Sequence, residues 1–262
     1  MMRRGNDMTK LIAITNQKGG VGKTTTAINL SAALAKRGVR VLLIDLDVQG
    51  NATSGLGISR KSDQPSGYDV LLGNATVAQA AVPTMIDTLF VLPSNRKLAG
   101  AEVELVEMEA REYRMKQQLA GQLDDYDFVL IDCPPSLGLL TINALTASDA
   151  ILVPIQCEYY ALEGLSQLMS TVKLVRRTTN PRLDIQGVVL TMFSARMNLC
   201  VQVVEEVKHA FKHKVYDTII PRSIRMSEAP SHGLPICLYD GRNIGAKAYD
   251  ALAAEFLQRE GR

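Results

Sequence analysis

The residues best suited to chemistry form one short loop, Lys18-Gly19-Gly20-Val21-Gly22-Lys23-Thr24-Thr25. An apolar run precedes the loop at 11–14, and a helix-like segment follows it at 26–36. Three glycines in four positions let successive backbone N–H groups point inward, which makes an anion site at a helix N-terminus. Lys23 adds a charge for the β- and γ-phosphates, and Thr24 adds a hydroxyl for Mg²⁺. The loop therefore predicts a site for a nucleoside triphosphate.

The front of this loop departs from the general pattern G-x-x-x-x-G-K-[ST]. The pattern places glycine at position 17, but this chain has Gln17, followed by a second lysine, Lys18. Because Lys23 and the backbone already serve the phosphates, Lys18 is a candidate to reach a phosphate bound by a neighbouring subunit. A cation supplied in trans accelerates phosphoryl transfer by roughly 10³ to 10⁵. Hydrolysis would then depend on dimerisation; the alternative is that Lys18 is a solvated loop charge.

Three carboxylates are expected near the loop. Asp45 and Asp47 follow an apolar run at 41–44, and Asp132 follows another and leads into a Pro-Pro loop at 133–138. Ligands of a parallel α/β sheet lie beyond the carboxyl ends of its strands. Asp132 fits a Walker B residue that binds the Mg²⁺ shell directly or through water, and one of the other two fits a residue that orients water or metal. The alternatives are a structural Asp132 and a capping pair at the strand end.

Apolar, β-branched runs alternate with helical segments along the chain. The runs are Leu11–Thr15, Val39–Ile44, Leu89–Leu92, Phe128–Ile131, Ala150–Pro154, Ile185–Met192 and Val215–Ile220. This alternation predicts an α/β fold: a single-domain, P-loop NTPase-like, mainly parallel twisted sheet flanked by helices on both faces. We expect residues 10–262 to form this domain and residues 1–9 a flexible extension. Residues 58–83 read as irregular, and Ala101–Leu119 as one long exposed helix.

The amino-acid composition limits the classes of protein to which this chain can belong. The chain has 262 residues, 47% of them hydrophobic, which is enough for a large buried core. No apolar run reaches membrane-spanning length, and the basic N-terminal sequence lacks the apolar region of a secretory signal. Four cysteines have no metal-site spacing, which predicts reduced, mostly packed thiols in a cytosolic protein.

The charge is uneven along the chain. The formal net charge is only +2, but residues 176–247 carry 11 Lys and Arg against 6 Asp and Glu. The local charge is thus +5, and the rest of the chain is at −3. A basic region of this kind creates a local positive field that the small net charge conceals. Such a field is suited to binding a polyanion.

Long motifs along the chain resemble one family. They are ITNQKGGVGKTTTAINL at 14–30, LLIDLDVQGNATSGLG at 42–57, LIDCPPSLGLLTINAL at 130–145, QCEYYALEGLSQL at 156–168 and TIIPRSIRMSEAPSHGLPI at 218–236. The chain resembles the ParA/Soj chromosome- or plasmid-partitioning ATPases, of the deviant Walker A group that also contains MinD. The resemblance extends from Lys10 to the last helix and goes far beyond the phosphate loop alone.

The resemblance implies roles for the site residues. Lys18 would be the signature lysine that crosses an ATP-sandwich homodimer, while Lys23 and Thr24 would bind phosphate and Mg²⁺. Asp47 aligns with the carboxylate that orients the attacking water, and Asp132 with the Walker B aspartate. The expected activity is slow hydrolysis of ATP to ADP and phosphate, stimulated by a centromere-binding ParB-type partner.

The same resemblance implies binding surfaces. Pro221 lies in the segment that would line the adenine. Similar proteins bind double-stranded DNA non-specifically as ATP dimers, and the matching positions are Arg196, Arg225 and, less closely, Arg222; the expected location is the nucleoid in the cytoplasm. Val48 departs from the family, which usually has proline after the switch aspartate; valine leaves φ free and loosens the loop, but removes no catalytic group.

Two other classes use the same loop. A MinD-like membrane-positioning ATPase needs a carboxy-terminal amphipathic helix; the tail 246–262 has an apolar stripe, but its many alanines favour packing on the sheet, so no stable membrane association is expected. A metabolic enzyme, such as an ATP-dependent amide or ring-forming synthetase or an iron–sulfur reductase, needs an acceptor pocket or suitably spaced cysteines. The sequence identifies neither.

Overall fold

The computed structural model describes residues 9–60, 64–158 and 161–262, and the side chains of residues 161–164 are left aside. Apart from Thr9, the proposed N-terminal extension lies outside the described residues. Thr9 itself is held at the domain, because its hydroxyl lies 2.7 Å from the carbonyl oxygen of Tyr126.

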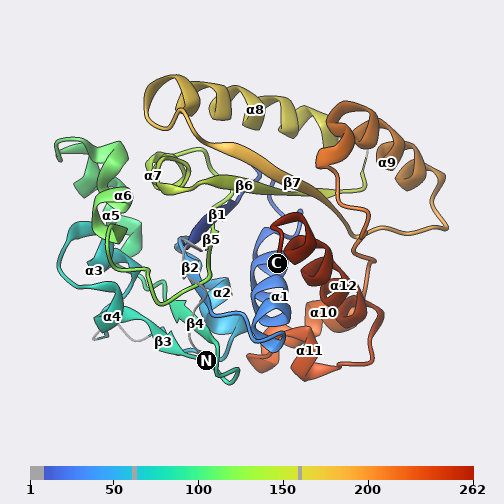
Figure 1. Cartoon of the computed structure of the whole chain (residues 1–262), viewed down its shortest axis with the longest axis horizontal. Helices are drawn as coiled ribbons and strands as arrows, with labels where there is room; N and C mark the ends of the chain where they lie inside the picture. Colours follow the sequence, from blue (N-terminus) through green and yellow to red (C-terminus); the bar gives the residue numbers. More distant parts are fainter. Residues whose placement is uncertain (1–8, 61–63, 159–160) are drawn as a thin grey trace.

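A twisted sheet of seven strands lies at the centre of the described residues, in the order β3-β4-β2-β5-β1-β6-β7 (Figure 1). The strands are β1 Lys10–Ile14, β2 Val41–Asp45, β3 Val82–Pro83, β4 Leu89–Leu92, β5 Phe128–Asp132, β6 Ala150–Gln156 and β7 Asp184–Thr191. All neighbouring strands are parallel except β3, which runs antiparallel to β4 at the edge. The predicted mainly parallel α/β sheet is confirmed.

Helices cover both faces of this sheet (Figure 1). They are α1 Lys23–Lys36, α2 Asn51–Gly55, α3 Gly67–Leu72, α4 Val77–Ala80, α5 Leu98–Val106, α6 Arg114–Leu119, α7 Leu139–Ala147, α8 Ala161–Thr178, α9 Asn198–Phe211, α10 Ile224–Glu228, α11 Ile236–Tyr239 and α12 Ile244–Arg259, with short 3₁₀ turns at Arg111–Tyr113, Lys212–Lys214 and Ala229–His232.

Two hydrophobic cores result, one on each face. Alternate residues of a strand point to opposite faces, so in β2 Leu42 and Ile44 belong to the core that includes residues of α5 to α9, whereas Val41 and Leu43 belong to the core that includes residues of α1 and α12. β2 is buried at every position, which agrees with its apolar run Val41–Ile44.

The carboxy-terminal helix α12 packs inside the domain, as predicted. Phe256 contacts Phe128 of β5 edge-on, with ring centroids 5.0 Å apart. The hydroxyl of Tyr249 lies 3.2 Å from that of Thr26 in α1. Among the described residues, no helix combines the length and the hydropathy that crossing a membrane requires.

The predicted strand Val215–Ile220 is wrong. In the described part of the chain this segment forms no strand, and only isolated bridges are made here, by Val215 to Val188 and by the following Pro221 to Phe193. Between them the N–H groups of Asp217 and Thr218 donate to the carboxylate of Glu255 in α12, both at 2.9 Å. A side chain has thus taken the donors that a continuous strand ladder needs.

The predicted long helix Ala101–Leu119 is also wrong, because it is broken between α5 and α6. Helix α5 ends at Val106, and Ala110, in the connection to α6, has a left-handed conformation with φ 50° that a continuous right-handed helix excludes. Residues 64–83 contain more regular structure than predicted. Capping boxes at Ser66 and Thr76 begin the short helices α3 and α4.

The four cysteines are free thiols, as predicted, and three of them are buried. Burial raises the pKa of Cys133 and of Cys157, which keeps both thiols protonated and unreactive.

Candidate nucleotide-binding site

The glycine loop joins the end of β1 to the start of α1. Gly20 and Gly22 have φ of 75° and 88°, a left-handed conformation in which a residue with a side chain would be strained. Gly22 is also the N-cap of α1. Gly19 and Gly20 are exposed. The N-terminus of α1 and the backbone of the loop therefore form an open anion site.

The two lysines of the loop have different surroundings. Lys23 is buried, and its Nζ donates to the carbonyl of Lys18 at 3.1 Å. Burial lowers the pKa of Lys23, against the opposing effect of Asp132. Lys18 is partly exposed, and its Nζ lies 3.5 Å from Oε2 of the exposed Glu158. Lys23 thus points inward to the loop, whereas Lys18 forms a surface ion pair of the kind that is easily exchanged.

The structure separates the roles of Asp45 and Asp132, which are neighbours in the register of β2 and β5. Asp45 accepts hydrogen bonds from the N–H of Thr53 at 2.7 Å, from its hydroxyl at 2.6 Å and from the N–H of Asp47 at 3.2 Å. Burial raises the pKa of Asp45 to about 6, and these hydrogen bonds limit the rise. Asp45 therefore braces the start of α2 and has little capacity left for a ligand.

Asp132 is fully buried, and neither carboxylate oxygen has a hydrogen-bond partner among the described residues. Burial, followed by the repulsion of Asp45, raises its pKa; the nearby Thr24 and Lys23 oppose the rise. An unpaired buried carboxylate beside a hydroxyl is costly unless a cation or ordered water completes it. Asp132 and Thr24 fit the oxygen donors that Mg²⁺ prefers, leaving positions for water and phosphate.

Asp47 lies beyond the end of β2, which stops at Asp45, so the two carboxylates are not on one continuous strand. Asp47 is mostly buried, and its Oδ1 accepts from the N–H of Gln49 at 2.9 Å. Its carbonyl accepts from the hydroxyl of Ser94 at 2.7 Å. The predicted role of Asp47 in orienting water stays a prediction.

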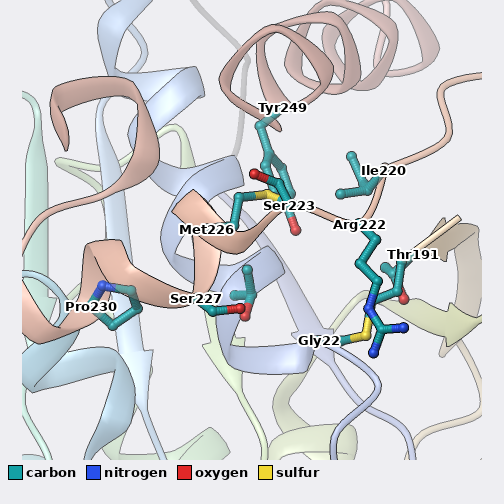
Figure 2. A pocket seen from close by; sticks show the side chains of 11 residues that line it. Gly22, Thr191, Ile220, Arg222, Ser223, Met226, Ser227, Pro230 and Tyr249 are labelled. Atoms are coloured by element: carbon teal, nitrogen blue, oxygen red, sulfur yellow. The ribbon is translucent and has the colours of Figure 1, made fainter. Parts of the chain in front are cut away.

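A cavity of about 410 Å³ adjoins the glycine loop. It is lined by Gly22, Thr25, Thr191, Met192, Ile220, Arg222, Ser223, Met226, Ser227, Pro230 and Tyr249. Figure 2 shows the guanidinium of Arg222 beside Gly22 and Thr191, with Ile220, Met226 and Tyr249 farther along the same space. Pro221 lies between two lining residues, so the segment predicted to line an adenine does border a cavity of nucleoside size.

The three predicted DNA-binding arginines differ in their surroundings. Arg222 lines the cavity next to the glycine loop. Arg225 is already paired with Glu228 at 3.1 Å and with Asp240 at 3.7 Å. Arg196 is exposed in the loop between β7 and α9 and makes no ion pair with a described residue. These differences depend on neighbours in the folded chain, so the spacing of the arginines could not predict them.

Two supporting residues were missed by sequence reasoning. The side chain of Asn16 accepts from the N–H of Lys18 at 3.1 Å and donates to the carbonyl of Pro154 at 2.8 Å, which fixes the front of the loop on β6. Glu102 of α5 lies against Gly138, where a Cβ would come within 2.3 Å of its Oε1. The neighbouring N-terminus of α7 favours that carboxylate. The only signal that the sequence offered for either of these residues was the position of Asn16, directly before Gln17 at the front of the loop.

A strand, a glycine loop and a helix at the carboxyl end of a parallel sheet, with a buried lysine and a buried aspartate that has no hydrogen-bond partner among the described residues, define a P-loop nucleotide-binding protein. A protein-family model described as an AAA domain matches residues 9–185. The chain is 59% identical to the sporulation initiation inhibitor protein Soj of Bacillus subtilis, over 95% of this chain and 98% of that protein. It is 54% identical to the chromosome partitioning protein ParA of Caulobacter vibrioides, over 96% and 95%. The chain belongs to the Soj/ParA family.

A solved structure of a protein that is not named Soj or ParA has the same fold. The cobyrinic acid a,c-diamide synthase of Mycobacterium smegmatis, crystallised with ADP and magnesium, superposes with a TM-score of 0.84 at 39% identity, over 97% of both chains. A protein with this fold has therefore been crystallised with a nucleotide and magnesium.

Proposed function

We propose that this protein is a partitioning ATPase that dimerises around ATP, binds DNA non-specifically in that state and releases it after hydrolysis. The observation that carries the proposal is the division between the two loop lysines. Lys23 is buried and its ammonium group bonds to the carbonyl of Lys18 within the loop, whereas Lys18 is partly exposed and, among the described residues, its ammonium group pairs only with the exposed carboxylate of Glu158. One lysine suffices for the subunit's own phosphates, so the second is available for a partner subunit.

The residues around the loop divide the work of phosphoryl transfer. The N–H groups of the loop and Lys23 bind the phosphates, and the cavity beside Gly22 and Pro221 takes the nucleoside. Thr24 and Asp132 would hold Mg²⁺, directly or through water, and this ion would neutralise charge on the phosphates. Asp47 orients the attacking water, and Lys18 supplies positive charge in trans. Positioning and charge neutralisation are the main requirements of this reaction.

DNA binding follows from the basic part of the chain. The local charge of +5 over residues 176–247 includes Arg196, Arg222 and Arg225. Binding through phosphates is insensitive to sequence and weakens steeply with salt. ATP acts as a switch ligand, because dimerisation doubles the basic surface that faces the duplex. A centromere-binding ParB-type protein would stimulate hydrolysis, and the ATP form would associate with the nucleoid.

The test is Lys18→Ala, with ATP-dependent dimerisation followed by light scattering and turnover followed by phosphate release. We expect both to fall, while binding of ATP to the monomer persists. Lys23→Ala is the matched control, because it removes the other lysine of the loop and weakens the binding of ATP itself. Normal dimerisation together with normal turnover in Lys18→Ala would refute the role in trans.

A second candidate is an ATP-dependent synthetase. The observation that favours it is the similarity, at 39% identity, to the solved structure named as a cobyrinic acid a,c-diamide synthase. Slow ATP turnover in the absence of any acceptor, increased by DNA and partner, supports the partitioning ATPase. A burst of turnover that requires an added small carboxylic acid and ammonia or glutamine would support the synthetase.

Membrane positioning by α12 is disfavoured by its packing. The apolar stripe of this helix, Tyr249, Leu252 and Phe256, is buried within the domain. Sedimentation with liposomes in the presence of ATP tests this, and clear recovery with lipid would favour the MinD-like alternative.

A further inference from the structure

The loop that carries Asp47 is held at three successive carbonyl groups. The hydroxyl of Ser94 donates to the carbonyl of Asp47 at 2.7 Å. Arg60 donates to the next two, from Nη2 to the carbonyl of Val48 at 2.6 Å and from Nη1 to that of Gln49 at 2.6 Å. One planar guanidinium therefore spans two adjacent peptide groups, which a single ammonium cannot do with the same geometry.

The held segment is a tight turn. The N–H of Gly50 donates to the carbonyl of Asp47 at 2.9 Å, and the carboxylate of Asp47 accepts from Gln49 at 2.9 Å. Gly50 has φ 61°, and a Cβ there would lie 2.1 Å from Nε of Arg60. The glycine thus serves two needs at once: a left-handed backbone, and room for the guanidinium to close over the turn.

Val48 occupies the second position of this turn, where proline is preferred because its ring fixes φ in advance. Valine provides no such restraint. The turn also has no strand on either side, because β2 ends at Asp45 and α2 begins at Asn51. Beyond the hydrogen bonds within the turn, its conformation therefore depends on hydrogen bonds from side chains outside it. Arg60 donates two of these.

We infer that Arg60 is a positioning residue for hydrolysis: it latches the turn 47–50 from outside, so that the carboxylate of Asp47 is held ready for the attacking water. This inference rests on the proposed function, in which Asp47 orients water. The guanidinium of Arg60 acts through the backbone, since its two hydrogen bonds are to the carbonyl groups of Val48 and Gln49. A carboxylate misplaced by about 1 Å costs up to about a hundredfold in rate, which is the scale on which such a latch acts.

The experiment compares Arg60→Ala, Arg60→Lys and a matched control, Arg37→Ala. Arg37 also donates to a backbone carbonyl, that of Asp250 at 3.1 Å, but it lies at the far end of α1. We expect Arg60→Ala to lower kcat for ATP about tenfold with KM within about twofold, Arg60→Lys to fall between it and wild type, and Arg37→Ala to match wild type. Hydrogen exchange of amides 48–51 without nucleotide should quicken about tenfold in Arg60→Ala alone.

Rescue separates positioning from general stability. Val48→Pro in the Arg60→Ala background should recover most of the lost kcat, because proline restrains the same turn from within. Unchanged exchange of amides 48–51, or no recovery with Val48→Pro, would overturn the inference. Should Arg60→Ala fold poorly, Arg60→Lys and its Val48→Pro derivative give the same comparison.

The variant Asp47→Asn distinguishes failure of the Arg60 latch from failure of the proposed role of Asp47. If it abolishes turnover while Arg60→Ala leaves kcat unchanged, the latch is refuted and the proposed function stands. If Asp47→Asn leaves turnover normal, the role of Asp47 fails, and with it the catalytic purpose of the latch, whatever hydrogen exchange shows for the turn.

Discussion

The ammonium group of Lys23 donates a hydrogen bond of 3.1 Å to the carbonyl oxygen of Lys18, five residues earlier in the same loop. The buried lysine thus closes the loop on itself and places the backbone of Lys18 beside the phosphate site. The side chain of Lys18 reaches Glu158 instead. One loop therefore presents one cation inward and one outward.

The two lysines should differ in their effect on nucleotide binding by the monomer. Lys23→Ala removes a charge aimed at the phosphates, and hydrogen bonds to charged groups contribute about 1.5 to 3 kcal/mol. We expect it to weaken ATP binding roughly tenfold to a hundredfold. Lys18→Ala should leave binding nearly unchanged. Titration with a fluorescent ATP analogue, at concentrations that keep the protein monomeric, tests both, and equal losses would contradict the assignment.

Asp132→Asn should uncouple Mg²⁺ from nucleotide binding without harming the fold. The side chain of Asp132 is buried without a hydrogen-bond partner among the described residues, so its charge opposes folding in the absence of a cation. We expect the nucleotide-free variant to melt at the same temperature as wild type or higher. The gain in ATP affinity on adding Mg²⁺ should disappear. A variant that unfolds without nucleotide, or keeps its full Mg²⁺ dependence, would argue for a structural Asp132.

Thr191→Val should loosen the glycine loop. The hydroxyl of Thr191, at the end of β7, donates to the carbonyl of Val21 at 2.8 Å, and this pair is buried. Valine has nearly the same shape, but leaves that carbonyl unpaired at a cost of about 1 to 3 kcal/mol. Chemical denaturation should show this loss of stability, accompanied by weaker ATP binding. Thr171→Val on the outer part of α8, whose hydroxyl bonds only within its own helix, is the matched control.

Glu255 should make stability depend on pH in the acidic range. Partial burial raises its pKa, but hydrogen bonds from Thr218 and Asp217, with Arg259 nearby, outweigh this and place the pKa below its usual value. A lowered carboxyl pKa stabilises the fold above the unfolded pKa of about 4.3, and this stability is lost as pH falls through the folded pKa. Glu255→Gln should therefore be less stable than wild type by about 1 kcal/mol at pH 7.

Denaturation curves of Glu255→Gln and wild type across this range provide the check. The difference in the free energy of unfolding should shrink as the pH falls below about 4 and wild-type Glu255 becomes protonated. A difference that stays constant with pH would mean that packing, and not charge, anchors the segment at 217–218.

Arg196→Ala should weaken DNA binding more than Arg225→Ala. Arg196 is exposed and makes no ion pair with a described residue, whereas Arg225 is already neutralised by Glu228 and Asp240. Loss of a phosphate contact lowers affinity for all sequences and reduces the slope of log K against log salt by about one. Binding of the ATP form to unrelated duplexes at several salt concentrations measures both. A larger effect of Arg225→Ala would show that its ion pairs open on DNA.

The sequence by itself determined the elements whose parts are contiguous. The glycine loop, the strand before it and the helix after it are one uninterrupted segment, so spacing alone predicts the anion site. The placement of Asp132 at the carboxyl end of a buried strand follows in the same way. The alternation of apolar runs and helical segments was enough for the mainly parallel sheet.

Only the tertiary structure decided which side chains remain free. Asp45 and Asp47 look equivalent in sequence, but Thr53 donates two hydrogen bonds to Asp45 and commits it to bracing α2. Glu255 takes the N–H groups that would have made 217–218 part of a strand. Arg60 closes over a turn ten residues away from it in the chain. Hydrogen-bond capacity is limited, and the partners that use it come from distant positions, so local spacing reveals where a group lies but not whether it is already satisfied.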